Sequence, residues 1–154
     1  MAQRRRAVRV LEARCTVIHA RAAALAGAVL VFAASEAGAQ SCGADLVFPR
    51  VLESDRYIVA YRTLPSPVVA GEHFVVEFAV CPRDRGQLPA SVRVDASMPE
   101  HRHGMNYRPV VTAKGDGRYR AEGLMFHMSG RWEMRFDLAT ADGTVRLAGP
   151  LHIE

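Results

Sequence analysis

The sequence lacks the long hydrophobic run, the helical periodicity and the catalytic motifs that would each point to a large class of proteins. Its longest charge-free apolar stretch, residues 22–34, is shorter than the ~20 residues that a membrane-spanning helix needs. After this stretch there is no Gly-x-Ser-x-Gly motif, no phosphate-binding loop and no internal repeat. We therefore predict one small domain that is not an enzyme.

Residues 1–39 have the pattern of a cleavable signal peptide. An arginine-rich leader precedes the apolar stretch, and Ala37-Gly38-Ala39 matches the small-x-small cleavage signal. An uncleaved membrane anchor is the alternative, which the shortness of the apolar stretch disfavours. We expect residues 1–39 to be removed, so that the mature chain is periplasmic or secreted and has no membrane span. It then consists of an N-terminal segment, 40–54, and a domain, 55–154.

The charge of the mature chain differs from that of the whole sequence. The whole sequence carries 20 Lys and Arg against 16 Asp and Glu. The leader contains all of this imbalance, since basic and acidic residues are equal in number after residue 39. The high isoelectric point therefore gives no support for nucleic-acid binding.

Two cysteines, Cys42 and Cys81, remain after the leader. In an oxidising compartment a pair of cysteines most simply forms a disulfide. A pair of thiolate metal ligands is a weaker alternative, because no second cysteine lies nearby in a chelating spacing. A redox role is weaker still, since there is no Cys-x-x-Cys motif.

Apolar and polar residues alternate with a period of two along most of the mature chain, which indicates strands. Turn signals separate the runs, among them Gly115-Asp116-Gly117 and Asp142-Gly143. The runs cover residues 57–61, 74–80, 92–96, 119–121, 124–128, 132–138 and 145–153. About seven short strands at this spacing predict an all-β fold, an immunoglobulin-like β-sandwich.

One run changes its phase. Tyr119 and Ala121 alternate in one register, whereas Leu124 and Phe126 alternate in the other. A β-bulge at Gly123 would reconcile the two halves and turn the residues next to Phe126 away from the main apolar face.

Histidine and methionine gather in two places. One group lies within residues 98–105 and the other within 125–128. In a sandwich, the end of one strand and the start of a later strand often meet at one edge, so the two groups could converge. Thioether sulfur with imidazole suits Cu(I), whereas imidazole alone also suits Cu(II) or Zn(II). The candidate metal ligands are His101, His103, Met105, Met125 and His127.

Other histidines and methionines have simpler interpretations. Met98 and Met134 share strand faces with apolar residues and are expected in the core, as is Met128 at a strand end. His73 and His152 are isolated near strand ends and are interpreted as surface residues.

Several short segments resemble the YtkA-like domain, which is similar to FixH and CopC-type exported immunoglobulin-like domains. These segments are Asp95-Ala96-Ser97-Met98-Pro99, His103-Gly104-Met105, Gly117-x-Tyr119 and Phe126-x-Met128-x-Gly130-x-Trp132. The resemblance covers roughly residues 55–150. It implies a small secreted or periplasmic β-sandwich, often associated with copper handling or with the assembly of respiratory complexes.

Two functions remain open from the sequence. The first is copper handling, with Cu(I) favoured, as a chaperone or scavenger that exchanges the ion with a periplasmic or membrane-bound metalloprotein. The second is a metal-free interaction module that assists the assembly of a respiratory or other periplasmic complex. Its docking loop would use residue types that are common at interface hot spots, here Arg102, Tyr107 and Arg108.

Overall fold

The computed structural model describes residues 42–47, 49–84 and 86–154. The predicted signal peptide and its cleavage site lie outside these residues. Within the described ranges, no helix has the length and apolar character that crossing a membrane requires.

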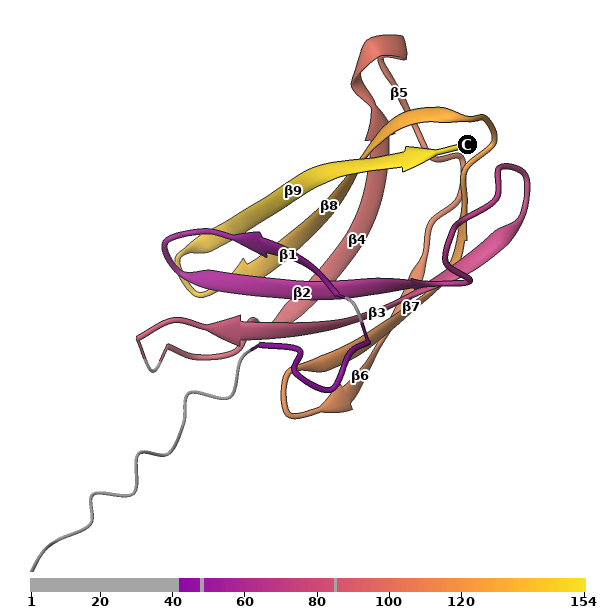
Figure 1. Cartoon of the computed structure of the whole chain (residues 1–154). Coiled ribbons are helices and arrows are strands. Elements are labelled where there is room, and N and C mark those ends of the chain that lie inside the picture. Colours follow the sequence, from indigo (N-terminus) through magenta and orange to yellow (C-terminus); the bar gives the residue numbers. More distant parts are fainter. Residues whose placement is uncertain (1–41, 48, 85) are drawn as a thin grey trace, which may run out of the picture. The chain divides into compact units, whose positions relative to one another are not determined.

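The described residues form two antiparallel sheets (Figure 1). One has the strand order β1-β2-β3-β7-β6, and the other has the order β5-β4-β8-β9. The elements are β1 (Arg50–Glu53), β2 (Tyr57–Leu64), β3 (His73–Pro82), β4 (Ser91–Met98), the 3-10 helix η1 (Pro99–His101), β5 (His103–Gly104), β6 (Val110–Gly115), β7 (Arg118–Met125), β8 (Gly130–Thr140) and β9 (Gly143–Ile153). The predicted β-sandwich is confirmed.

The apolar faces of the two sheets pack against each other, as the period-two pattern predicts. Phe136 of β8 contacts Tyr61 of β2 and Phe78 of β3, with ring centroids 5.2 and 5.1 Å away. Each of these side chains is at most 1% exposed. Burying one such side chain contributes about 1.5–3 kcal/mol, so this aromatic contact is a main link between the sheets.

Three strands have no counterpart among the predicted runs: β1, β5 and β6. All of their residues are exposed or half-buried. They lie at sheet edges, where one face does not have to be apolar. Periodicity therefore cannot reveal them. β1 comes from the segment before residue 55 and pairs with β2 from Arg50↔Tyr61 to Glu53↔Ile58.

β7 contains the predicted bulge. Phe74 of β3 pairs with Leu124 and Val76 pairs with Ala121, so that β7 has one residue more than β3 between these pairs. Gly123, in this interval, has a φ of +83°, which glycine adopts without strain. Ala121, Leu124 and Phe126 are consequently all buried.

β1 closes one side of the sandwich. It pairs with β2 and also contacts β9 of the opposite sheet, and it lies between them in Figure 1. A side chain on Gly149 of β9 would overlap the Leu52 side chain of β1. Glycine at position 149 thus allows this close approach.

The strands run between two ends that differ in chemistry. We call the end with Cys42, Cys81 and Tyr57 the disulfide end, because β3 ends there at Pro82, next to the bonded Cys81. We call the other the imidazole end, because His101, His103 and His127 gather there beside the first residues of β8.

At the disulfide end, the predicted bond between Cys42 and Cys81 is confirmed. The turn that begins at Cys42 covers the outer face of the first sheet. Gly43 approaches Ala60 there, where an added Cβ would be 2.5 Å from the Ala60 Cβ. Asp45 of the same turn pairs with Arg118 of β7. The segment before β1 is thus attached covalently and electrostatically to the sheet.

Candidate functional site

The position of His103 follows from the register of β5. In the antiparallel pair of β4 and β5, His103 lies opposite Met98. Residues that are opposite each other have side chains on the same face. Met98 is 2% exposed in the core, so His103 also points inward, at the end of the sandwich. Its Nε2 is buried and has no hydrogen-bond partner in the described part of the chain.

His127 approaches from the opposite sheet. It follows the end of β7 and the fully buried Phe126, and its own side chain is exposed. The imidazole centroids of His127 and His103 are 4.8 Å apart. The bulge at Gly123 contributes to this placement, because it sets the phase in which Phe126 points inward and His127 does not.

His101 is the third imidazole of the group. It is the last residue of η1, and the next residue, Arg102, has a left-handed φ of 54° that ends the helix. The His101 ring centroid lies 5.8 Å from that of His103, and its side chain is exposed. His103 therefore has an exposed imidazole from each of two separate loops as a neighbour.

Trp132 lies against two of these imidazoles. It is fully buried, and its indole contacts His103 and His127 edge to face at 5.7 and 5.3 Å. The indole Nε1 donates a hydrogen bond of 3.0 Å to the Met128 carbonyl oxygen. With that polar group satisfied, Trp132 offers His103 only aromatic surface, and the buried Nε2 gains no partner from it.

The spacing of the imidazoles is compatible with a shared metal ion after side-chain rotation. Two imidazoles that bind one ion at ~2.1 Å in a tetrahedral arrangement have ring centroids roughly 5 Å apart. The observed separations of 4.8 and 5.8 Å bracket this value. In the residues that the structure describes, however, no three His, Cys, Asp or Glu side chains are already arranged to hold an ion. Since His101 and His127 are exposed, their rings have room to turn.

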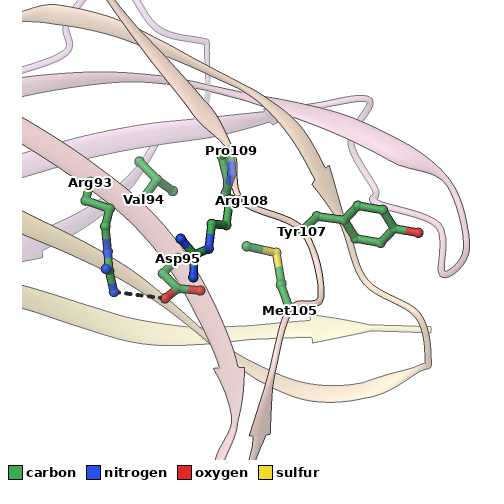
Figure 2. A pocket seen from close by; sticks show the side chains of 7 residues that line it. All are labelled: Arg93, Val94, Asp95, Met105, Tyr107, Arg108 and Pro109. Atoms are coloured by element: carbon green, nitrogen blue, oxygen red, sulfur yellow. Dashed lines mark hydrogen bonds and ion pairs between the residues drawn. The ribbon is translucent and has the colours of Figure 1, made fainter.

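The two candidate methionines have other neighbours. Met105 packs against the core and lines a cavity with Arg93, Val94 and Asp95 of β4 (Figure 2). Met125 pairs with His73 across β7 and β3 and is half-buried. Figure 2 shows the Met105 sulfur directed into the cavity. A thioether ligand for a metal ion at the imidazoles would therefore have to come from a side chain that is not grouped with them.

The remaining histidines and methionines largely match their simpler interpretations. Met98 and Met134 are core residues, and Met128 packs partly against the core. His152 is exposed. His73 is exposed too, but its ring contacts that of Tyr107 edge to face at 5.4 Å. Sequence spacing gave no signal for this contact.

The three residues proposed for docking are all exposed. Arg102 ends η1 at the imidazole end. Tyr107, which is 40% exposed, and Arg108 lie on the crossover from β5 to β6, where they line the same cavity as Met105. Arg102 therefore does not share the cavity that contains the other two.

Charged groups cover the outer faces of both sheets. Glu77 accepts hydrogen bonds from Arg62 and Arg120, and chiefly the bond from Arg62 lowers the pKa of its carboxyl group. Asp137 accepts two bonds from Arg146, which lower its pKa in the same way. Glu100, next to His101, faces Arg131 at 3.8 Å. These pairs are typical of solvated sheet faces.

Comparison with known proteins identifies the family. The model of the YtkA-like family matches residues 52–137, more than half of the chain. No curated protein matches. Among solved structures, the chain is similar to a DUF4426 family protein from Pseudomonas aeruginosa PAO1, with 10% sequence identity and a TM-score of 0.49. That alignment covers 68% of this chain and 94% of the other.

Proposed function

This chain belongs to the YtkA-like family, and on that premise we propose that it is an exported periplasmic protein that binds copper at its imidazole end. The observation that carries the proposal is the Nε2 of His103, which is buried without a hydrogen-bond partner and next to two other imidazoles. A buried polar atom without a partner costs free energy. A bound ion would remove this penalty.

The chemistry of the donors favours copper. Neutral imidazoles bind Cu(II) and Zn(II), and the thioethers of Met105 and Met125 are suited to Cu(I). The Cys42–Cys81 disulfide supports an oxidising compartment, as expected for an exported protein. Two of the three imidazoles are exposed, so an ion would be reachable by an acceptor protein. A chaperone or scavenger, which must release its cargo, requires such access.

Trp132 makes the proposal easy to test, because it is the only tryptophan of the chain. Its ring contacts both His103 and His127. Cu(II) bound by these imidazoles would quench the indole fluorescence, with an endpoint that gives the stoichiometry. We expect one Cu(II) per protein. Zn(II) and, under anaerobic reducing conditions, Cu(I) are titrated in parallel against a competing chelator.

Single substitutions assign the ligands. His103→Ala and His127→Ala are expected to abolish the quenching, and His101→Ala to weaken it. His152→Ala is the matched control, since His152 is exposed on β9 and does not belong to the imidazole group. Met105→Leu and Met125→Leu should leave Cu(II) binding unchanged, since neither side chain is grouped with the imidazoles. Weaker Cu(I) binding in either variant would identify a sulfur ligand. Unchanged stoichiometry in both His103→Ala and His127→Ala would contradict the ligand assignment.

The alternative function is a metal-free interaction module for the assembly of a respiratory or other periplasmic complex. The exposure of Tyr107 and Arg108 beside a cavity supports it. If none of the three ions binds with a dissociation constant below about 10 μM, the copper proposal fails and this alternative gains support.

A further inference from the structure

The side of the sandwich opposite β1 is incompletely covered. β4 pairs with β8 from Ser91↔Ala139 to Ser97↔Glu133. On its other side, β5 pairs only with Ser97 and Met98. One further bond, from the Met105 N–H to the Ala96 carbonyl oxygen at 3.0 Å, extends this contact. β6 of the opposite sheet approaches β4, but across the described residues no strand pairs with β4 between Ser91 and Asp95 on this side.

The direction of the free backbone groups follows from the Met105 bond. In a strand, the N–H and C=O of one residue point to the same side, and the side alternates from residue to residue. The Ala96 carbonyl points towards Met105. Val94 and Val92, two and four residues earlier, therefore direct their N–H and C=O groups to the same open side.

A cavity of about 430 Å³ adjoins this edge. Its walls are β4 and the crossover segment, which contributes Met105, Tyr107, Arg108 and Pro109 (Figure 2). Its volume lies in the usual range for ligand sites, roughly 300–1,000 Å³. An added strand at the edge would place its side chains at the mouth of the cavity.

The charges at this edge are predominantly positive. Asp95 Oδ2 is bound by Arg135 of β8 at 2.6 Å and more loosely by Arg93 at 3.3 Å. The Arg93 side chain is 67% exposed. Arg108, whose side chain reaches towards Asp95 in Figure 2, forms no ion pair with any described residue. Arg93 also faces Asp137 at 3.9 Å. Because exposed ion pairs of this kind are weak, Arg93 can turn to an acidic partner, as can Arg108.

Pairing with a second copy of this edge is disfavoured. An antiparallel pair of β4 strands centred on Arg93 would use Val92 and Val94, but it would place the two Arg93 side chains opposite each other, where like charges destabilise. A pair centred on Val94 would need the edge-side groups of Ala96. These are occupied, since the N–H of Ala96 bonds to Asp95 Oδ1 and its carbonyl accepts from Met105.

We propose that the open edge of β4 binds an extended acidic segment of a partner protein by strand addition. The backbone of Val92 and Val94 provides the hydrogen bonds, and Arg93 and Arg108 bind the carboxylates of the segment. The exposed ring of Tyr107 packs on its apolar side chains. This inference does not depend on metal binding, because none of these residues belongs to the imidazole group.

The test uses a defined probe, an acetylated and amidated octapeptide of alternating Val and Glu, with EDTA present. Amide hydrogen exchange is measured by NMR on the purified protein with and without the peptide. We expect slower exchange at Val92 and Val94, whereas the amides of Arg93 and Asp95, which face β8, should not change. Binding without protection at Val92 and Val94 would overturn the proposal.

Charge-reversal variants form the second part of the test. Arg93→Glu should weaken peptide binding about tenfold or more. The matched control is Arg131→Glu, because Arg131 is equally exposed at 67% but lies on the central strand β8; it should change binding by less than about twofold. Equal binding of a Val-Lys octapeptide would contradict an acidic partner. Concentration-dependent dimerisation that protects Val92 and Val94 without peptide would identify a second copy as the occupant.

Discussion

The two ends of the sandwich differ in the interactions that their polar groups make. At the disulfide end, the Tyr57 hydroxyl donates to the Gln87 carbonyl oxygen at 2.8 Å, Arg56 pairs with Asp142 at 3.0 Å, and Cys42 is bonded to Cys81. At the imidazole end, the Nε2 of His103 is buried without a partner in the described structure.

The contrast predicts which substitutions change stability and which change binding. At the disulfide end the Arg83 Nε is also buried without a partner in the described residues, but the same guanidinium group pairs with Glu53. At the imidazole end the unpartnered nitrogen belongs to a ring with two other imidazoles beside it, which is the arrangement on which the proposed metal site rests. Substitutions at the first end should therefore change the free energy of unfolding, and substitutions at the second should change binding.

The largest effect is expected from the disulfide. Replacing Cys42 and Cys81 together by serine should lower the free energy of unfolding by roughly 3–4 kcal/mol, because the bond closes a loop with a sequence separation of 39. Guanidinium unfolding measures the change. Quenching of Trp132 by Cu(II), recorded on the folded double variant, should match the unsubstituted protein. Weakened quenching would show that the two ends are coupled.

Two glycines allow a finer comparison of the ends. Gly117 and Gly123 have similar φ values, +72° and +83°, so alanine at either position strains the backbone by about 1–2 kcal/mol. A Cβ on Gly117, at the disulfide end, would also lie 2.6 Å from the Val80 carbonyl oxygen, whereas one on Gly123 meets nothing within 4 Å.

Gly117→Ala should therefore lower the free energy of unfolding by about 1–3 kcal/mol more than Gly123→Ala. Urea unfolding of the two variants provides the measurement. Equal losses would mean that the disulfide end relaxes around the added methyl group, contrary to the tight packing described for it.

Glu77 lies on the outer face between the ends and gives the sandwich an acid-sensitive contact. Its pKa is lowered in the folded protein, so its stabilising contribution is present above the unfolded value of about 4.3 and is lost as the pH falls through the lower folded value. Glu77→Gln should cost about 1 kcal/mol at pH 7 and flatten the decline of stability below pH 5. Denaturant unfolding between pH 7 and pH 3 measures the free energy of unfolding of both proteins. If the variant loses stability below pH 5 as steeply as the unsubstituted protein does, the assignment to Glu77 is wrong.

The smallest change in stability is expected at His103. His103→Leu removes the buried unpartnered nitrogen and keeps an apolar group against Trp132. The free energy of unfolding should rise or change by less than about 1 kcal/mol, while Cu(II) binding is lost. Thermal unfolding without metal and the quenching titration measure the two effects. A large loss of stability would show that His103 has a structural purpose instead.

Local sequence patterns predicted much of the fold. Alternation along 57–61, 74–80 and 132–138 identified the inward faces of β2, β3 and β8, because burial on one face of a strand imposes a period of two on the sequence. The phase change in β7 located the bulge at Gly123, and the two cysteines after residue 39 suggested one simple pairing.

By itself, the sequence determined which side chains face inward along each long strand and that His and Met gather in two segments, and it favoured a disulfide between Cys42 and Cys81 over other roles. Only the tertiary structure decided that His103 has His101 and His127 as neighbours, that Met105 turns into a cavity beside β4, and that β1 lies against β9 while part of the β4 edge has no pairing strand. The reason is physical. The face of a side chain follows from neighbours in the sequence, whereas the meeting of strand ends depends on pairing register between distant segments.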